Sequence, residues 1–184
     1  CLDYLPIDLN CLLYKYETDF AWADRELGKD KDAKHWDGLA GRRKHEINKY
    51  MWYKRRGFYF DYNYQKDQRG DTWSLAGFFP LWAGLASPEQ AEQMVNNLSK
   101  FEHSGGLATT SRPLLDMSIF GSLKTQWAFP NGWAPLHYIV ISGLKNYGYD
   151  KDAEKIARKW IRTNLYWFER YGVFQEKYNV VKPH

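Results

Sequence analysis

The ten residues Gln126–Pro135 combine side chains that suit the recognition of a sugar. Their sequence, Gln-Trp-Ala-Phe-Pro-Asn-Gly-Trp-Ala-Pro, is too broken by proline and glycine for a helix interior or a central strand, so we expect a rigid loop. Indole faces stack on the C–H faces of a sugar ring, while amides bind its hydroxyl groups. The candidate substrate-binding residues are therefore Gln126, Trp127, Asn131 and Trp133. The alternative is a packed loop whose tryptophans belong to the core.

The same segment resembles the second signature of the α,α-trehalase family, which usually reads Gln-Trp-Asp-x-Pro-Asn-Gly-Trp-Ala-Pro. Three further segments resemble family motifs in the family's own order. They are Leu-Pro-Ile-Asp-Leu-Asn at 5–10, Gly-Gly-Leu-Ala-Thr-Thr-Ser at 105–111 and Glu-Lys-Tyr-Asn-Val at 176–180. The order and wording of the four motifs favour trehalose over other α-glucosides as the substrate.

The resemblance implies an all-α fold, part of an (α/α)6 toroid with an inner and an outer ring of helices, of which this chain would form about half. It also implies hydrolysis of trehalose, a disaccharide, to two glucose molecules by an inverting mechanism. Such a mechanism uses two carboxyl groups roughly 6.5–9.5 Å apart, one protonating the leaving oxygen and the other activating water.

Glu176 matches the family's general base and is the candidate catalytic residue. Phe174 and Tyr178 flank it, so we expect a half-buried carboxylate with a tuned pKa. The alternative is an ordinary surface glutamate paired with Lys177. The threonines at 109 and 110 are expected to fix their loop through hydrogen bonds from side chain to backbone.

Two departures from the family pattern bear on activity. Ala128 replaces the aspartate of the second signature, and a lost hydrogen-bond acceptor there would cost about 1–3 kcal/mol. The family's catalytic acid resembles an aspartate in a Trp-Asp-Phe-Ser-Ser-Arg-Trp segment, which these 184 residues do not contain. We therefore interpret residues 1–184 as a single partial catalytic domain, from the C-terminal half of a trehalase, completed by a missing segment or a second chain. Two alternatives stay open: a sugar-binding or vestigial module without turnover, and an (α/α)6 hydrolase of another α-glucoside.

Composition argues against several other functions. No run of about 18 apolar residues occurs, so no membrane-spanning helix is expected. The five histidines show no metal-ligand spacing, and no phosphate-binding glycine motif is present, so we expect neither a metal nor a cofactor. The net charge of +4 is modest and basic residues lie beside acids, so nucleic-acid binding is not expected. The two cysteines leave the cellular compartment undecided.

Helical periodicity and capping residues predict the elements that position these motifs. Helices are expected at about 8–28, 32–53, 74–85, 87–101, 135–146 and 150–171. Ser87, Pro88 and Gln90 predict a capping box, and Pro80 is expected to end or kink its helix. One short extended insert is expected at 58–64, and an irregular stretch of functional importance at 103–134.

Two helices have clear apolar stripes. The predicted inner residues of the second helix are Trp36, Leu39, Ile47 and Tyr50. Those of the last helix are Ala153, Ile156, Ala157, Trp160, Ile161, Leu165 and Phe168. Part of a ring has two open flanks, so we also expect exposed apolar surface that a partner or a further segment would cover.

Overall fold

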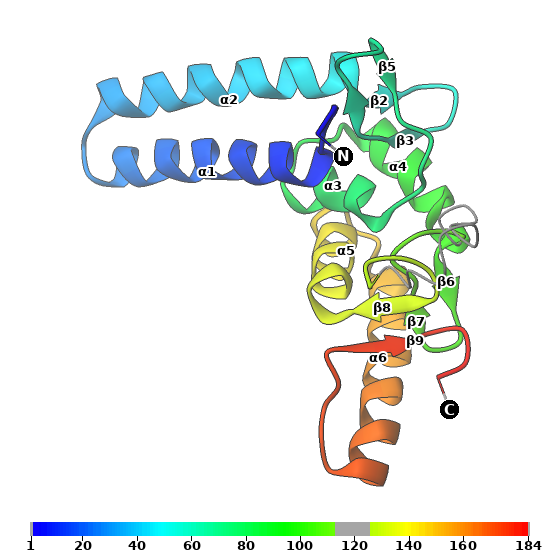
Figure 1. The fold of residues 1–184 in the computed structure, drawn as a ribbon. Coiled ribbons are helices and arrows are strands. Elements are labelled where there is room, and N and C mark those ends of the chain that lie inside the picture. The colour runs from blue at the N-terminus through cyan, green and yellow to red at the C-terminus, as the bar shows by residue number, and fades with distance from the viewer. Residues whose placement is uncertain (1, 113–125, 184) are drawn as a thin grey trace.

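The computed structural model describes residues 2–112 and 126–183, so Cys1, residues 113–125 and His184 lie outside the described chain. Within these ranges six α-helices dominate. They are α1 (Ile7–Glu26), α2 (Asp30–Tyr50), α3 (Phe79–Trp82), α4 (Pro88–Asn96), α5 (Ala134–Asn146) and α6 (Asp150–Tyr171). Figure 1 shows α1 and α2 as a long hairpin that extends to one side, whereas α6 extends below the middle of the molecule. The predicted all-α class of helical hairpins is confirmed.

Short antiparallel ribbons connect the helices. The strands are β1 (Tyr4–Leu5), β2 (Trp52–Tyr53), β3 (Phe58–Tyr59), β4 (Tyr62–Asn63), β5 (Gln68–Arg69), β6 (Glu102–His103), β7 (Gly106–Leu107), β8 (Asn131–Trp133) and β9 (Lys177–Asn179). They form one three-stranded sheet, β1-β4-β5, and the pairs β2-β3, β6-β7 and β8-β9. The predicted insert corresponds to β3 and β4, whereas the other ribbons were not predicted. In particular, β6, β7 and β8 lie in the stretch expected to be irregular, of which residues 113–125 are not described.

Capping chemistry fixes several helix ends as predicted. The Ser87 hydroxyl accepts a hydrogen bond from Gln90 N (3.2 Å), and Ser87 N donates to Gln90 Oε1 (2.8 Å), which completes the capping box. The helix α6 has the predicted bounds and ends at Gly172, whose φ of 71° suits glycine. A residue distant in sequence caps the N-terminus of α1: Ile7 N donates to Asp61 Oδ1 (2.9 Å).

The apolar segment 74–85 is not one helix, which corrects the prediction. A 3₁₀ helix, η1 (Leu75–Phe78), precedes the single turn of α3, and a second one, η2 (Leu98–Lys100), follows α4. Pro80 lies in the first turn of α3, where its missing N–H costs no hydrogen bond, so it starts the helix rather than ending it.

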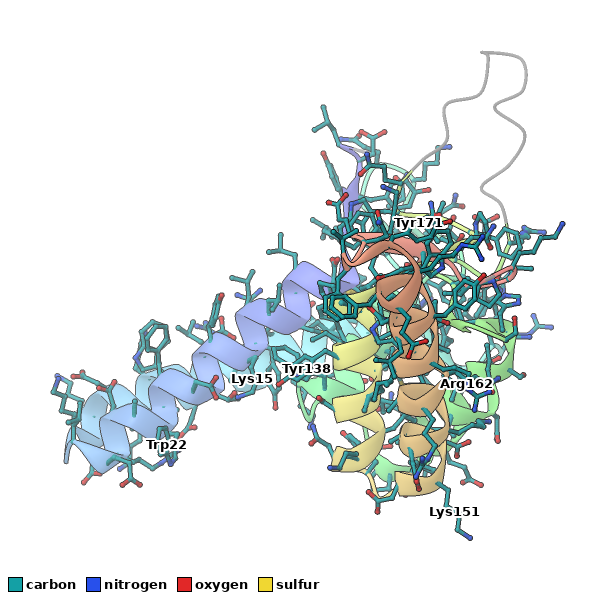
Figure 2. The ribbon with its side chains drawn as sticks, turned by 90° about the horizontal axis from the view of Figure 1, so that it is seen from below. Lys15, Trp22, Tyr138, Lys151, Arg162 and Tyr171 are labelled. Atoms are coloured by element: carbon teal, nitrogen blue, oxygen red, sulfur yellow. The ribbon has the colours of Figure 1, made fainter. Side chains whose placement is uncertain are left out.

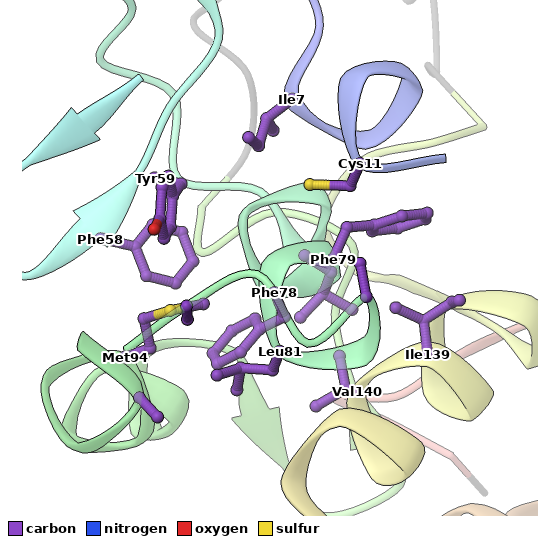
Figure 3. Close-up of a cluster of buried hydrophobic side chains, with 14 of the residues drawn as sticks. Ile7, Cys11, Phe58, Tyr59, Phe78, Phe79, Leu81, Met94, Ile139 and Val140 are labelled. Carbon is purple, nitrogen blue, oxygen red and sulfur yellow. The ribbon is translucent and has the colours of Figure 1, made fainter. Parts of the chain in front are cut away.

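The core gathers buried side chains from α1, β3, η1, α3, α4 and α5 (Figure 3). Ile7 and Cys11 enter it from α1, and Val140 enters it from α5. Phe58 is its aromatic centre. Its ring lies 5.1 Å from that of Phe78 in an edge-to-face arrangement. The α1–α2 hairpin and the α5–α6 pair both pack against this core.

The apolar stripes are only partly buried. In α2 only Ile47 of the predicted inner residues is fully buried. In α6 the N-terminal positions are covered, whereas Ile161, Leu165 and Phe168 are exposed. The reason is length: α5 has 13 residues and α6 has 22, so α5 cannot cover the far half of its partner.

Exposed aromatic residues also lie at both extremities of the molecule. Figure 2 shows Trp22 far out on the α1 hairpin and Tyr171 at the end of α6. These faces match the open flanks expected for part of a ring.

Gly77→Ala tests the core packing. A Cβ atom at this position would overlap the Phe58 ring and lie 2.7 Å from Tyr59 O, so the free energy of unfolding should fall by about 1–3 kcal/mol. Gly41→Ala in α2 is the matched control, because no atom lies within 4 Å of its Cβ and alanine favours a helix by about 0.5–1 kcal/mol. Urea unfolding of both variants should give changes of opposite sign, and two changes of the same sign would contradict the packing described.

Candidate active site

The pairing of β8 with β9 brings the two most distant motifs together. Its register sets Asn131 opposite Asn179, Gly132 opposite Tyr178 and Trp133 opposite Lys177. Glu176 directly precedes β9, so it lies one residue beyond the pair formed by Trp133 and Lys177. The glutamate that follows α6 and the tryptophans that precede α5 thus share one small region.

The two faces of this ribbon differ. Because successive strand residues point to opposite sides, Trp133 and Lys177 share one face while Tyr178 points to the other. Tyr178 is buried and its ring lies edge-on to Trp160 of α6, with centroids 5.4 Å apart. The Lys177 ammonium group lies 5.3 Å from the centroid of Trp133.

The two tryptophans form a stacked pair with different exposures. Their ring centroids are 3.9 Å apart and their planes differ by 5°. Trp133 is only 4% exposed and its Nε1 donates to Gln126 O (3.0 Å), whereas Trp127 is 52% exposed. Trp133 therefore packs as a core residue, and Trp127 is the indole that remains open to solvent.

The side-chain amides of Asn131 and Gln126 also differ, since one is bonded within the loop and the other is exposed. Asn131 Nδ2 donates to Gln126 O (3.1 Å), so this amide closes the tryptophan loop, residues 126–133, from inside. The Gln126 side chain is exposed, and among residues 2–112 and 126–183 no hydrogen bond engages its amide. Ala128 has a buried methyl group, and its carbonyl accepts from Asn131 N (2.9 Å), so the turn closes without a carboxylate at this position.

Glu176 is not half-buried, which corrects the prediction. Its side chain is 70% exposed, and its Oε2 lies 3.7 Å from Lys177 Nζ, the ion pair named as the alternative. Neither flanking aromatic residue covers it. Phe174 stacks on Phe168 at 4.6 Å, and the ring of Tyr178 packs against Trp160 while its hydroxyl accepts from Gln175 N (2.8 Å).

The Gly-Gly-Leu motif lies directly beneath the ribbon. Gly105 N donates to Val180 O (2.8 Å), and Val180 N donates to Pro130 O (3.0 Å), so three backbone segments are joined in series. A Cβ atom on Gly105 would lie 3.0 Å from Val180 Cα, and one on Gly132 would lie 2.8 Å from Leu107 O. Glycine is needed at both positions because the backbones approach so closely.

The threonines of the same motif hold the tryptophan loop, as the sequence predicted. Thr109 donates to Asn131 O from both its backbone N (2.9 Å) and its Oγ1 (2.7 Å). Thr110 Oγ1 accepts from Phe129 N (2.9 Å). These bonds explain why the two motifs occur together in the chain.

One residue of this region was missed by the sequence analysis. His137 of α5 is buried, its Nε2 accepts from Leu107 N (2.8 Å), and its Nδ1 lies 2.8 Å from Trp133 O. Its ring stacks on that of Trp160 at 3.9 Å. Burial lowers the pKa of His137 to about 4. A lone histidine in a helical sequence carries no signal of such a position.

Neither a metal site nor a membrane span emerges from the described residues. Across 2–112 and 126–183, no group of three or more His, Cys, Asp or Glu side chains is arranged to hold a metal ion. No helix in this part of the chain combines the length and apolarity needed to cross a membrane.

Residues 1–184 match the family model described as Trehalase. The chain belongs to the trehalase family. The cytosolic neutral trehalase of Kluyveromyces lactis is 39% identical over 199 residues, which cover 100% of this chain and 26% of that protein. The structure of neutral trehalase Nth1 from Saccharomyces cerevisiae matches with a TM-score of 0.89 and 37% identity, covering 100% of this chain and 35% of the yeast chain.

A more distant structure shares the fold alone. The GH63 mannosylglycerate hydrolase from Thermus thermophilus gives a TM-score of 0.80 at 19% identity, over 98% of this chain and 41% of that chain. The predicted family and the predicted helical toroid are thus confirmed for this trehalase-family chain. It spans about a quarter of the length of the curated relatives it matches.

His137 predicts a pH dependence of stability. In the unfolded chain its pKa is about 6.5, whereas burial lowers the folded value to about 4, so in this range the unfolded chain binds a proton that the folded chain does not. Burial of the neutral His137 ring contributes to the free energy of unfolding in full above pH 6.5, and this contribution is lost as the pH falls towards 4. Its size is on the order of 3 kcal/mol. Urea unfolding of wild type and His137→Gln between pH 7.5 and 4.5 should show the stability difference shrinking at acid pH. The exposed His45→Gln control should show no such trend, and a pH-independent difference for His137→Gln would refute the assignment.

Proposed function

We propose that the protein to which these residues belong hydrolyses α,α-trehalose to two glucose molecules, and that this chain supplies the general base. The observation that supports the proposal is the β8–β9 pairing, in which Trp133, the stacking partner of the exposed Trp127, lies opposite Lys177, the residue after Glu176. Relatives named trehalases cover the whole chain, and this supports trehalose as the sugar.

The proposed chemistry follows from the exposure of each group. Glu176 is open to solvent, so its carboxylate can accept a proton from the water that attacks the anomeric carbon. In an inverting reaction the acid lies on the opposite side of the bond, roughly 6.5–9.5 Å away, and a segment outside this chain would supply it. Trp127 would stack on one glucose ring, and the amide of Gln126 would bind its hydroxyl groups.

The remainder of the ring is part of this proposal. The exposed apolar faces of α1 and α6 would be covered by a missing segment or a second chain. The relatives, which are about four times as long as this chain, support a further segment of the same protein.

Glu176→Gln in the full-length protein tests the base. The amide cannot accept a proton, so glucose release from trehalose should fall by about 10²–10⁴-fold. Glu169→Gln, an exposed glutamate of α6, is the matched control and should keep wild-type activity. Equal activity of the two variants would show that the base lies elsewhere.

Trp127→Ala tests the stacking surface. Loss of an aromatic face worth about 0.5–1.5 kcal/mol should raise the KM for trehalose about threefold to tenfold. Trp22→Ala removes a comparably exposed indole from the distant α1 hairpin and should leave the KM unchanged. An unchanged KM in Trp127→Ala would favour a purely structural pair.

The second candidate is a sugar-binding module without turnover. The buried methyl group of Ala128 favours it, since the resembling family motif has a carboxylate at this position. Calorimetric binding of trehalose without glucose release from the full-length protein would support this candidate. Release of glucose only from other α-glucosides would instead indicate a different substrate on the same fold.

A further inference from the structure

We propose that His137 is a positioning residue of the active site, whose imidazole ties the Gly-Gly-Leu strand to the strand that carries Trp133. Through this tie it fixes the tryptophan loop relative to Glu176. The inference rests on the proposed function for its catalytic consequence, but its structural part can be tested without substrate.

The hydrogen bonds determine the state of the ring. Leu107 N donates to Nε2, so this nitrogen carries no proton. The proton of the neutral ring is therefore on Nδ1, which donates to Trp133 O. Leu107 belongs to β7 and Trp133 to β8, and no hydrogen bond of either ladder joins these two strands directly. The imidazole is thus a bridge between two ribbons.

The surrounding backbone leaves space for this ring and little else. A Cβ atom on Gly106 would lie 2.5 Å from Nε2, and one on Gly132 would lie 3.0 Å from Cε1. One face of the ring stacks on Trp160, which itself contacts Tyr178 of β9. The ring therefore contacts β7 and β8 directly and β9 through a single indole.

This arrangement links the ring to the chemistry. Trp133 lies opposite Lys177, the residue that follows Glu176, so a shift of β8 relative to β9 would change the spacing between the stacked indoles and the carboxylate. Without the imidazole, Leu107 N would remain buried with no acceptor unless β7 and β8 shifted locally to admit water, and the bonds from Thr109 to Asn131 O would then be the nearest remaining link between them. Misplacement of reacting groups by about 1 Å lowers turnover by up to about 100-fold.

Two substitutions of His137 distinguish a role in positioning the tryptophan loop from a role in packing alone. His137→Leu fills the space with an apolar side chain that has neither donor nor acceptor. His137→Gln keeps one donor and one acceptor at the end of its side chain. Tyr147→Phe is the control for lost stability, because it deletes the hydrogen bond to Ala86 O (2.7 Å) near the other end of α5.

The three variants are compared in the full-length protein under conditions where unfolding curves show all of them folded. We expect His137→Leu to lower the kcat for trehalose by about 10- to 100-fold with a smaller change in KM, and His137→Gln to restore most of it. Tyr147→Phe should retain the wild-type kcat. Wild-type kcat in folded His137→Leu would overturn the proposal and leave His137 a packing residue.

A substrate-free readout keeps this test independent of the proposed function. The stacked pair Trp127–Trp133 should give an exciton-coupled circular dichroism signal, which His137→Leu should lose and His137→Gln should retain. If the wild-type protein does not hydrolyse trehalose, the proposed function fails, and this signal alone decides the positioning role. A signal unchanged in His137→Leu would overturn it.

Discussion

The close backbone approach of three segments is the constraint on which the candidate site depends. The loop before β7, the strand β9 and the tryptophan loop are joined in series by Gly105 N to Val180 O and Val180 N to Pro130 O. Thr163 of α6 extends the series, since its Oγ1 donates to Gly105 O (2.9 Å). Glycine at 105 and 132 makes the approach possible, because side chains there would overlap neighbouring backbone. The segment after α6 is therefore held against the segment before α5, and these bonds reinforce the β8–β9 pairing.

The β8–β9 ribbon combines buried supporting residues with exposed residues of the candidate site. On its inner face Tyr178 is buried against Trp160, whereas the side chains of Trp127 and Glu176 are exposed. A rigid inner face lets the outer groups keep a fixed spacing without a core of their own, which is the arrangement that positions reactive groups best. The stacking of Trp127 on Trp133 follows the same logic, since one indole is anchored through its Nε1 and holds the other in place.

The helices could be predicted from the sequence because the patterns that indicate them are local. The bounds of α6 and the capping box at Ser87 follow from periodicity and from side chains a few residues apart. The ribbons have no comparable signal, because strands of two or three residues are too short to show alternation. This explains the error at Glu176: its aromatic neighbours in sequence were expected to cover it, but Phe174 stacks on Phe168 and Tyr178 packs against Trp160. The exposed half of α6 has a similar cause, since periodicity indicates an apolar face without showing whether a partner covers it.

The surroundings of two buried or partly buried carboxylates, Glu102 and Asp61, bear on whether either could be the acid that the proposed mechanism requires. A general acid must hold its proton near neutral pH. Glu102, in the neighbouring ribbon, does not: burial alone would raise its pKa, but hydrogen bonds from Lys159 and Lys155 lower it overall. Burial raises the pKa of Asp61, yet this residue precedes β4 and accepts from Ile7 N. The strand β5, which pairs with β4, lies near the top of Figure 1, well above β9. We therefore do not propose either carboxyl group as the acid of the inverting pair.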